Sequence, residues 1–330
     1  MAQQDKNSDS IQQCIMNLRT HLNARILGQE RLVSRLLIAL LADGHLLVEG
    51  APGLAKTRAV KELSAGVEGD FHRIQFTPDL LPGDLTGTDI YHPQNGSFVF
   101  QPGPLFHHLI LADEINRAPA KVQSALLEAM AERQVTIGGK TYPLPELFLV
   151  MATQNPIEQE GTYPLPEAQL DRFLMYVKID YPDAKVEHDI LMLARKEAMK
   201  QCLTHETPTP KLTQKTLFSA REAVLQVHTS PALEQYLVQL VVATRNPRVY
   251  SEQLAQWVRF GASPRATIAL DRCSKAHAWL SGRDYVTPED IHVIVHDVLR
   301  HRVLLSFEAE AEGISSDDFI DSILSFVAVP

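Results

Sequence analysis

The amino-acid sequence predicts an α/β fold in which helices sandwich a five-stranded parallel sheet, followed by an all-α C-terminal domain. Before Tyr181, five short apolar runs alternate with helical segments, which is typical of a parallel sheet. After Tyr181-Pro182-Asp183 the periodicity is helical, and we detect no further strand. A chain of 330 residues is long enough for about two domains, so we expect a core over 1–181 and a helical domain over 182–330.

The predicted elements share clear apolar periodicity and are separated by turn-forming residues. We expect the strands at 45–49, 72–76, 109–113, 147–153 and 174–179. We expect the C-terminal helices at 184–199, 213–227, 231–245, 251–258, 264–281 and 288–301, with a linker at Thr204–Lys211 that contains Pro208 and Pro210. Asn-Gly and Gly-Gly turns predict hairpins at about 89–100 and 134–142. The tail from Ile314 either packs back on the chain or stays loose.

A glycine-containing loop joins the strand at 45–49 to a helix and ends in Lys-Thr. Its residues are Gly50, Ala51, Pro52, Gly53, Leu54, Ala55, Lys56 and Thr57. Backbone N–H groups in such a loop, with the positive end of the following helix dipole, form a seat for phosphate oxygens. Lys56 can reach the terminal phosphates, and the Thr57 hydroxyl can ligate Mg²⁺. The loop therefore predicts nucleotide binding; an ordinary strand-to-helix turn is the alternative.

The loop departs from the strict phosphate-binding pattern at one position. That pattern has Gly immediately before the Lys, and Ala55 stands there in this chain. Only a positive φ demands Gly, so we expect a mild substitution if Ala55 has right-handed helical torsions.

Polar side chains end two of the later strands. Asp113 and Glu114 close the run that starts at Leu109, and Asn155 follows the strand at 147–153. Ligands of open α/β sheets bind at the carboxyl ends of the strands. Asp113 would hold Mg²⁺ through water, Glu114 would activate the attacking water, and Asn155 would hydrogen-bond the γ-phosphate or that water. The alternatives are an ordinary strand end and a turn-forming Asn before Pro.

Composition restricts the class of protein. Lys+Arg 31 against Asp+Glu 40 gives a net charge of −9, which argues against a duplex-DNA binder. Cys14, Cys202 and Cys273 are isolated, and we interpret them as small buried apolar residues in a reducing compartment. The N-terminus has no apolar core, and no run has the length of a membrane span. We therefore expect a cytoplasmic protein without a membrane span.

Taken together, the motifs resemble those of the AAA+ ATPases and, within them, the MoxR family, over about residues 10–305. The loop Gly50–Thr57 is similar to that family's phosphate loop, including the Ala before the Lys. Leu109–Glu114 resembles its Mg²⁺-binding and water-activating motif, and Asn155 its first sensor. The two hairpins resemble the family's two inserts.

Two arginines acquire roles only through this resemblance. Arg172, in Leu170-Asp171-Arg172-Phe173, is similar to the arginine finger, and Arg265, after Ser263-Pro264, to the second sensor. Arg117 is a further candidate for a contact between subunits, but a surface or capping role fits it equally well. Gly28 and Gln29, between the first two helices, complete the candidate nucleotide contacts.

The resemblance implies a Mg²⁺-dependent ATPase that assembles into rings, typically hexamers, with active sites shared between neighbours. An arginine finger from the next subunit is typically worth ~10³–10⁵ in rate, because it stabilises charge developing on the γ-phosphate. The resemblance also implies remodelling, maturation or metal loading of protein clients, often with a partner that carries a von Willebrand A domain.

Other functions stay open as alternatives. One is a regulatory module that switches assembly on nucleotide binding and turns over slowly. Another is a nucleic-acid motor. The net negative charge argues against it, as does the lack of aromatic residues interspersed with basic ones in the two hairpins. His292 and His296 share a helix face near His301, but without the Glu of a metalloprotease motif we expect a solvated face.

Overall fold

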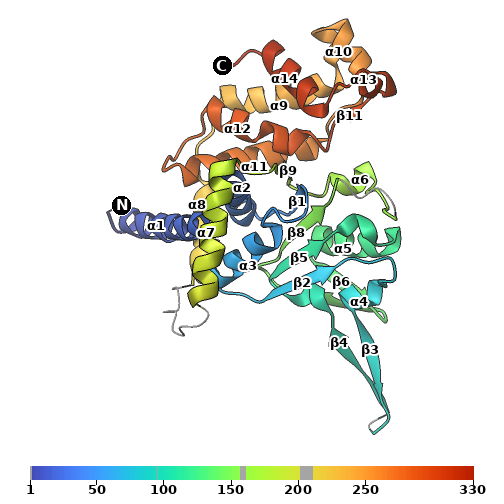
Figure 1. Ribbon diagram of the computed structural model, residues 1–330. Coiled ribbons are helices and arrows are strands. Elements are labelled where there is room, and N and C mark those ends of the chain that lie inside the picture. Colours follow the sequence, from blue (N-terminus) through green and yellow to red (C-terminus); the bar gives the residue numbers. More distant parts are fainter. Residues whose placement is uncertain (1, 95, 157–160, 201–210) are drawn as a thin grey trace. The chain divides into compact units, whose positions relative to one another are not determined.

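The computed structural model describes residues 2–94, 96–156, 161–200 and 211–330 (Figure 1). The chain forms two compact units. The first comprises Met1–Leu37, Leu47–Pro164 and Val177–Phe218, and the second comprises Ile38–Leu46, Leu165–Tyr176 and Ser219–Pro330. The domain boundary expected between residues 181 and 182 stays a prediction. Cys202, Asn95 and residues 204–210 of the expected linker lie outside the described residues.

A five-stranded sheet with the strand order β2-β5-β8-β1-β9 confirms the predicted parallel sheet. Its strands are β1 (Leu46–Glu49), β2 (Phe71–Gln75), β5 (Leu109–Asp113), β8 (Leu149–Gln154) and β9 (Met175–Lys178). All five residues of β5 are buried, as expected for a central strand covered on both faces. In the register of the sheet, Gln75 lies beside Asp113, and Ala112 lies beside Ala152. The carboxyl ends of β2, β5 and β8 are therefore level.

Several helices and two 3₁₀ turns lie before Tyr181. They are α1 (Ala2–Arg25), α2 (Glu30–Leu41), α3 (Lys56–Gly66), α4 (Pro82–Thr86), α5 (Ala120–Glu132) and α6 (Glu167–Leu170), with short 3₁₀ turns η1 (Pro104–Phe106) and η2 (Ile115–Arg117). Ile15, Leu18 and Leu22, spaced along one face of α1, are all buried. Cys14 on the same helix is exposed, which corrects the expectation of a buried residue, whereas Cys273 is buried.

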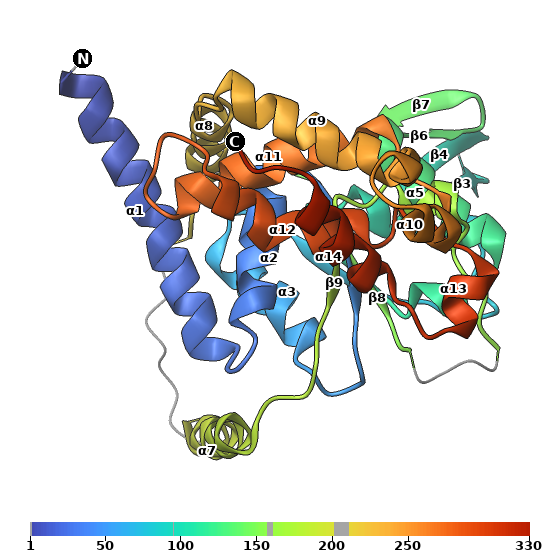
Figure 2. The ribbon, with the colours of Figure 1, turned by 90° about the horizontal axis from the view of Figure 1, so that it is seen from above.

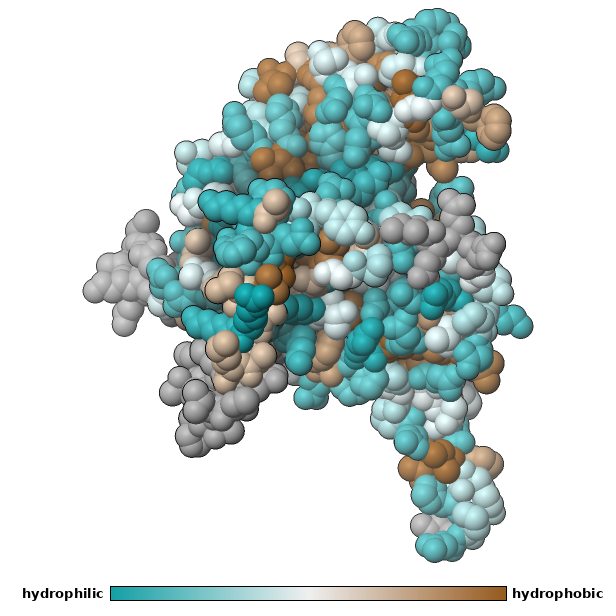
Figure 3. All heavy atoms as spheres, in the orientation of Figure 1, coloured by the Kyte–Doolittle hydropathy of each residue, from teal (hydrophilic) through white to brown (hydrophobic). Residues whose placement is uncertain are grey.

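Two antiparallel hairpins interrupt the α/β part of the chain. They are formed by β3 (Gly87–His92) with β4 (Ser97–Pro102), and by β6 (Gln134–Ile137) with β7 (Lys140–Pro143). Gly138 and Gly139 have φ values of 56° and 81°, as a two-residue hairpin turn with positive φ requires. The β3–β4 hairpin extends away from the sheet (Figure 1). Its outer part exposes the side chains of Ile90, Tyr91, Phe98 and Val99. Figure 3 shows brown, hydrophobic atoms on this hairpin.

The rest of the described chain is mostly helical, although one short pair of strands corrects the expectation that no strand follows Tyr181. Its helices are α7 (Ala184–Lys200), α8 (Gln214–Leu225), α9 (Pro231–Arg245), α10 (Glu252–Trp257), α11 (Pro264–Leu280), α12 (Pro288–Leu299), α13 (Phe307–Ala311) and α14 (Ser316–Phe326), with η3 (Pro247–Val249) and a short pair of strands, β10 (Val258–Phe260) and β11 (Leu304–Leu305). In the second unit, α11 packs against α9 and α12, and α14 against α9 and α12 (Figure 2). Phe319, Ile320 and Ile323 of α14 are buried, so the C-terminal tail packs back on the unit. No helix of the described ranges has the length and apolar character needed to cross a bilayer.

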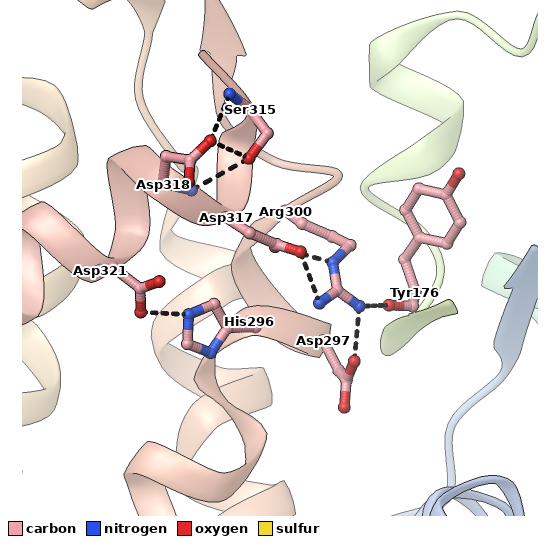
Figure 4. Close-up of polar contacts among 8 residues, drawn as sticks. All are labelled: Tyr176, His296, Asp297, Arg300, Ser315, Asp317, Asp318 and Asp321. Atoms are coloured by element: carbon pink, nitrogen blue, oxygen red, sulfur yellow. Dashed lines mark hydrogen bonds and ion pairs between the residues drawn. The ribbon is translucent and has the colours of Figure 1, made fainter. Parts of the chain in front are cut away.

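Polar contacts join α12 to its neighbours in the second unit (Figure 4). Arg300, whose side chain is 4% exposed, donates to Asp297 Oδ1 at 2.6 Å, to Asp317 Oδ1 at 3.0 Å and to the Tyr176 carbonyl at 2.8 Å. His296 contacts Asp321 at 2.8 Å, and the described residues contain no cluster of three or more metal-binding side chains. His292 on the same face of α12 contacts the Tyr236 hydroxyl at 2.8 Å, and His301, after the helix, is buried rather than solvated.

The backbone conformation of Ala55 decides how well Ala replaces Gly in the phosphate loop. Its torsions, φ 57° and ψ 15°, are left-handed, so the condition under which Ala would be a mild substitute for Gly is not met. A non-glycine residue in this region costs roughly 1–2 kcal/mol, because its Cβ crowds the following carbonyl oxygen. The loop therefore holds its shape at a conformational cost.

Replacing Ala55 with Gly should increase the stability of the protein. We expect Ala55→Gly to raise the free energy of unfolding by about 1 kcal/mol, the steric relief exceeding the entropy that Gly adds to the unfolded chain. Urea unfolding without nucleotide measures it. The matched variant is Gly53→Ala, at φ 86° with no atom within 4 Å of the added Cβ, which should lower stability by about 1 kcal/mol. A destabilised Ala55→Gly protein would contradict the left-handed assignment.

Asp290 provides a second test of the fold. It is fully buried and accepts hydrogen bonds from Arg283 at 2.6 and 2.7 Å. It also contacts His277 at 2.6 Å and accepts a hydrogen bond from the N–H of Thr287, the N-cap of α12. Burial alone would raise the pKa of Asp290, but these hydrogen bonds outweigh it and hold that pKa well below its ordinary value. A carboxylate with a lowered folded pKa stabilises the protein above its unfolded pKa, and this contribution is lost as the pH falls further.

We therefore expect Asp290→Asn to lower the free energy of unfolding by about 3 kcal/mol at pH 7, because the Arg283 guanidinium loses the buried carboxylate that pairs with it. The difference from wild type should stay constant down to about pH 5 and shrink below about pH 4, where the unfolded carboxylate takes up its proton. Urea unfolding at several pH values measures this, with the exposed Asp284→Asn as control. A difference that grows towards acid pH would show that Asp290 is not held as the carboxylate.

Candidate active site

The phosphate loop is fixed to the ends of two neighbouring strands. Lys56, the first residue of α3, donates through Nζ to the Gly50 carbonyl at 2.6 Å and to the Gln154 carbonyl at 3.4 Å. The Gly50 N–H also donates to Gln154 O at 3.4 Å. Gly50 lies so close to the next strand that a Cβ would meet Ile179 Cγ1 at 2.4 Å and Ile179 O at 2.9 Å. The start of the loop therefore requires Gly for space.

A cavity of about 390 Å³ lies between this loop and the carboxyl ends of the strands. It is lined by residues 52–58, Arg73, Asp113, Glu114 and Asn155. The structure thus brings together, on one cavity, the phosphate loop and the polar residues that the sequence predicted from separate strands. Gly50 and Ala51 lie just before the lining part of the loop.

Asp113 is held from two sides at the end of β5. Thr153 Oγ1 on β8 donates to Asp113 Oδ1 at 2.6 Å, and Arg73 on β2 donates to Oδ2 at 2.7 and 3.1 Å. Thr153 is fully buried and also accepts a hydrogen bond from the Glu114 N–H at 2.9 Å. The carboxylate is therefore oriented by the strands on both sides of β5 before any ligand contacts it.

Glu114 follows Asp113 in an unusual backbone conformation. Its φ and ψ, 57° and 51°, are left-handed, and this turn sends the chain away from the direction of β5. Its Oε2 accepts a hydrogen bond from Gln75 Nε2 at 2.6 Å and lies 3.2 Å from Arg117 Nη1. Strained backbone of this kind concentrates at functional sites, where surrounding contacts maintain it. The arrangement exposes the Glu114 carboxylate to the cavity rather than to the core.

The sequence predicted no role for Arg73, Gln75 and Thr153 of this site. Arg73 and Gln75 alternate along β2, so both side chains lie on one face, and the register sets Gln75 beside Asp113. Alternation at the carboxyl end of a predicted strand was the signal available in the sequence. The register between β2 and β5 decides what these side chains contact, and the sequence contains no local signal for it.

The residues around the cavity fit a magnesium ion that is bound together with phosphate. Thr57 and Asp113 offer hard oxygen donors on the same cavity. Mg²⁺ is usually held by one or two carboxylates together with substrate phosphates and waters rather than by an all-protein cage. This agrees with the absence, within the described residues, of any group of three or more metal-binding side chains.

A second, mainly apolar cavity of about 100 Å³ adjoins the first. Both cavities are lined by Gly53, Leu54, Ala55 and Arg58. The smaller one is also lined by Arg25, Ile26, Leu27, Gln29, Pro182, Ile190, Leu193 and Ala194. Gln29 is buried and donates to the Asp180 carbonyl at 3.2 Å. An apolar pocket next to a phosphate seat suits the base of a nucleotide.

Gly28 and Gln29, in the turn between α1 and α2, were both predicted to contact the nucleotide. Gln29 lines this cavity, and Gly28 does not. Gly28 has φ 72°, and a Cβ there would meet Val186 Cγ1 at 2.3 Å. Its role is therefore to allow the turn and the close approach of α7.

α7 is tied to the start of α3 by an ion cluster. Glu197 accepts hydrogen bonds from Arg58 through both carboxylate oxygens, one of them at 3.1 Å, and from Arg25 at 3.4 Å. The hydrogen bond from Arg58 is the main reason that the pKa of Glu197 is lowered. Arg58 directly follows Thr57, so this cluster joins the phosphate loop to the helix that lines the apolar cavity.

The remaining predicted residues, Arg172 and Arg265, belong to the second unit. Arg172 lies between the end of α6 and β9 and is partly buried. Arg265 is exposed in the first turn of α11, after the N-cap Ser263. Their predicted roles as arginine finger and second sensor stay predictions.

Comparison with known proteins now identifies the family. Residues 45–175 match the model of the ATPase family associated with various cellular activities (AAA), and residues 254–323 match that of the AAA lid domain. The chain is 47% identical to Chaperone MoxR1 of Mycobacterium tuberculosis, over 92% of this chain and 79% of that protein. It is 44% identical to the uncharacterized protein YeaC of Bacillus subtilis, over 94% of this chain and 93% of that one.

More distant relatives and a solved structure agree. Protein MoxR of Paracoccus denitrificans is 33% identical, over 94% of each chain. The crystal structure of a candidate ATPase from Cytophaga hutchinsonii superimposes with a TM-score of 0.90 at 45% identity, covering 100% of this chain and 98% of that one. Sequence identity of this extent, together with the phosphate loop and acidic strand end on one cavity, shows that the chain belongs to the MoxR family of AAA+ ATPases.

Proposed function

We propose that this ATPase uses Mg²⁺-dependent hydrolysis of ATP to drive chaperone-like remodelling of protein clients, as a ring-shaped oligomer. One observation carries the proposal: the phosphate loop, Asp113, Glu114 and Asn155 line a single cavity, although they come from three separate stretches of the chain. This is the set of groups that phosphoryl transfer to water requires.

The reaction follows from what each group can do. Lys56 and the backbone N–H groups of the loop hold the terminal phosphates, and Asn155 orients the γ-phosphate or the attacking water. Thr57 and Asp113 would hold Mg²⁺, which would supply positive charge to neutralise the phosphate oxygens. Glu114 accepts a hydrogen bond from the water and directs its lone pair in line with the γ-phosphate. The apolar cavity takes the base.

The contacts of Glu114 imply that catalysis needs a rearrangement. Gln75 and Arg117 both contact the Oε2 atom that would have to face the water. Lys56 likewise donates to the Gly50 and Gln154 carbonyls. ATP binding would draw Lys56 from these carbonyls towards phosphate oxygens, and Glu114 would exchange its contacts with Gln75 and Arg117 for one with the water.

Sharing of sites between subunits rests on Arg172. A guanidinium presented to the γ-phosphate of a neighbour stabilises the developing charge and makes hydrolysis depend on assembly. In more detail, we propose that the ring is a hexamer, that it acts with a partner that carries a von Willebrand A domain, and that the client undergoes maturation or metal loading. The resemblance to the family supports these details. The exposed apolar end of the β3–β4 hairpin is the surface that we assign to client contact.

The same internal contacts of Glu114 and Lys56 favour the alternative of a slow nucleotide switch. Catalytic groups that are engaged in hydrogen bonds within the protein slow basal turnover. The two functions differ in their response to a client. A remodelling enzyme hydrolyses ATP faster when its client is present, whereas a switch keeps one slow rate.

The Glu114→Gln variant tests the proposed role of Glu114. It should bind ATP with unchanged affinity and hydrolyse it at least about 100-fold more slowly, since general-base catalysis contributes about 10²–10⁴-fold. Isothermal titration and phosphate release measure the two properties. Glu128→Gln, on the exposed face of α5, is the matched control and should leave both unchanged. Full activity of Glu114→Gln would remove Glu114 from the role.

The Arg172→Ala variant tests sharing between subunits. It should keep ATP binding and lose about 10³-fold in turnover, the lower end of the range for arginine fingers. Arg248→Ala, at an exposed position of the same unit, is the control. Mixing Arg172→Ala with Glu114→Gln should restore part of the activity, because some interfaces then combine an intact finger with an intact Glu114. Mixed rings that stay inactive would argue for sites complete within one subunit.

A further inference from the structure

A chain of hydrogen bonds in the second unit connects the segment that carries Arg172 to the helix start that carries Arg265. Asp171, the residue before Arg172, accepts a hydrogen bond through Oδ2 from Ser263 Oγ at 2.8 Å. Ser263 is the N-cap of α11, and its Oγ accepts a hydrogen bond from the Arg265 N–H at 3.2 Å. One carboxylate and one hydroxyl therefore separate the backbones of the two arginines.

Arg302 fixes the other oxygen of Asp171. Its side chain is only 3% exposed, and its Nε donates to Asp171 Oδ1 at 2.8 Å. The other donors of the guanidinium go to main-chain carbonyls: Phe173 at 2.6 Å, Leu174 at 3.2 Å, Asp171 at 3.4 Å, and Val298. All five N–H groups of a guanidinium are thus used, which anchors residues 171–174 to the end of α12.

The start of α11 has its own anchor on α9. The Ala262 N–H donates to Thr244 Oγ1 at 2.9 Å, and Arg245 Nε donates to the Ala262 carbonyl at 2.6 Å. The bond between Ser263 and Asp171 joins these two anchored segments, yet neither anchor depends on it. The N-cap uses Ser263 Oγ as an acceptor, whereas the bond to Asp171 uses its hydroxyl proton.

We propose that Asp171 and Ser263 are positioning residues that couple Arg172 to Arg265, so that the nucleotide state detected by Arg265 sets the position of Arg172. The inference rests on the proposed function, which gives Arg172 its role, and on the family resemblance, which gives Arg265 the predicted role of second sensor. A hydrogen bond from a hydroxyl to a carboxylate is short and directional, so a shift at the start of α11 displaces Asp171 with it. The ion pair with Arg302 makes residues 171–174 respond as one piece.

The test measures hydrogen exchange of the full-length chain with and without Mg²⁺ and ATP, in the Arg172→Ala background. That background removes the direct contact of the finger with a neighbour's nucleotide and slows hydrolysis, so any protection of residues 168–176 by ATP comes through the second unit's own bonds. We expect ATP to slow exchange in this segment. Ser263→Ala should abolish the protection, and Ser263→Thr, which keeps the hydroxyl, should retain it. Ser230→Ala, which removes the equivalent N-cap of α9, should also retain it.

A kinetic measurement separates positioning from a purely structural role. In the otherwise wild-type chain, Ser263→Ala should lower kcat on the order of tenfold, as expected for one lost hydrogen bond to a charged group, and leave the Kd for ATP unchanged. Ser263→Thr should restore kcat. Equal losses in Ser263→Ala and Ser230→Ala would overturn the inference, because both lose an N-cap.

Two further outcomes distinguish the inference from the proposed function. If ATP protects the phosphate loop, residues 50–57, while exchange in 168–176 does not change or does not depend on Ser263, the coupling is wrong and the proposed function stands. If ATP leaves the phosphate loop unprotected, the proposed function fails and the coupling fails with it.

Discussion

Parallel pairing of β1, β5 and β8 brings their carboxyl ends to one edge of the sheet, and the site depends on this arrangement. β1 supplies the phosphate loop, β5 supplies Asp113 and Glu114, and β8 supplies Thr153 and Asn155. The strand order sets β8 between β5 and β1, so the Gln154 carbonyl can accept from Lys56 while Thr153 accepts from Glu114 and donates to Asp113. β8 is therefore the bridge between the phosphate seat and the acids.

Much of this could be predicted from the sequence, because apolar strands that end in polar residues leave a strong local pattern. The five strands, the phosphate loop and the acidic strand end were all found in this way, and the relatives confirm the family. The order of strands in the sheet was not predictable from local pattern alone. For this reason the contacts of Arg73 and Gln75, which cross from β2 to β5, were missed.

Backbone torsions account for the other difference. The handedness of Ala55 stayed open in the sequence analysis, because a residue type by itself does not reveal a left-handed φ that its surroundings impose. Glu114 shows the same property at the end of β5. Both residues border the cavity, so local conformational cost is concentrated where the chain must present backbone donors and a carboxylate to a ligand. At Ala55 and Glu114 the backbone therefore adopts torsions that these residue types do not favour, and both positions border the ligand cavity.

The two compact units are interleaved along the chain, and this affects how the protein can be dissected. The second unit takes one stretch from Ile38–Leu46 and another from Leu165–Tyr176, in addition to everything after Phe218. Arg172 and Asp171 lie in the middle one of these stretches, far in sequence from Arg302. No single cut in the polypeptide yields both units whole. Separately expressed halves would each lack parts of their own core, so studies of an isolated unit require its separate stretches to be joined by linkers rather than simple truncations.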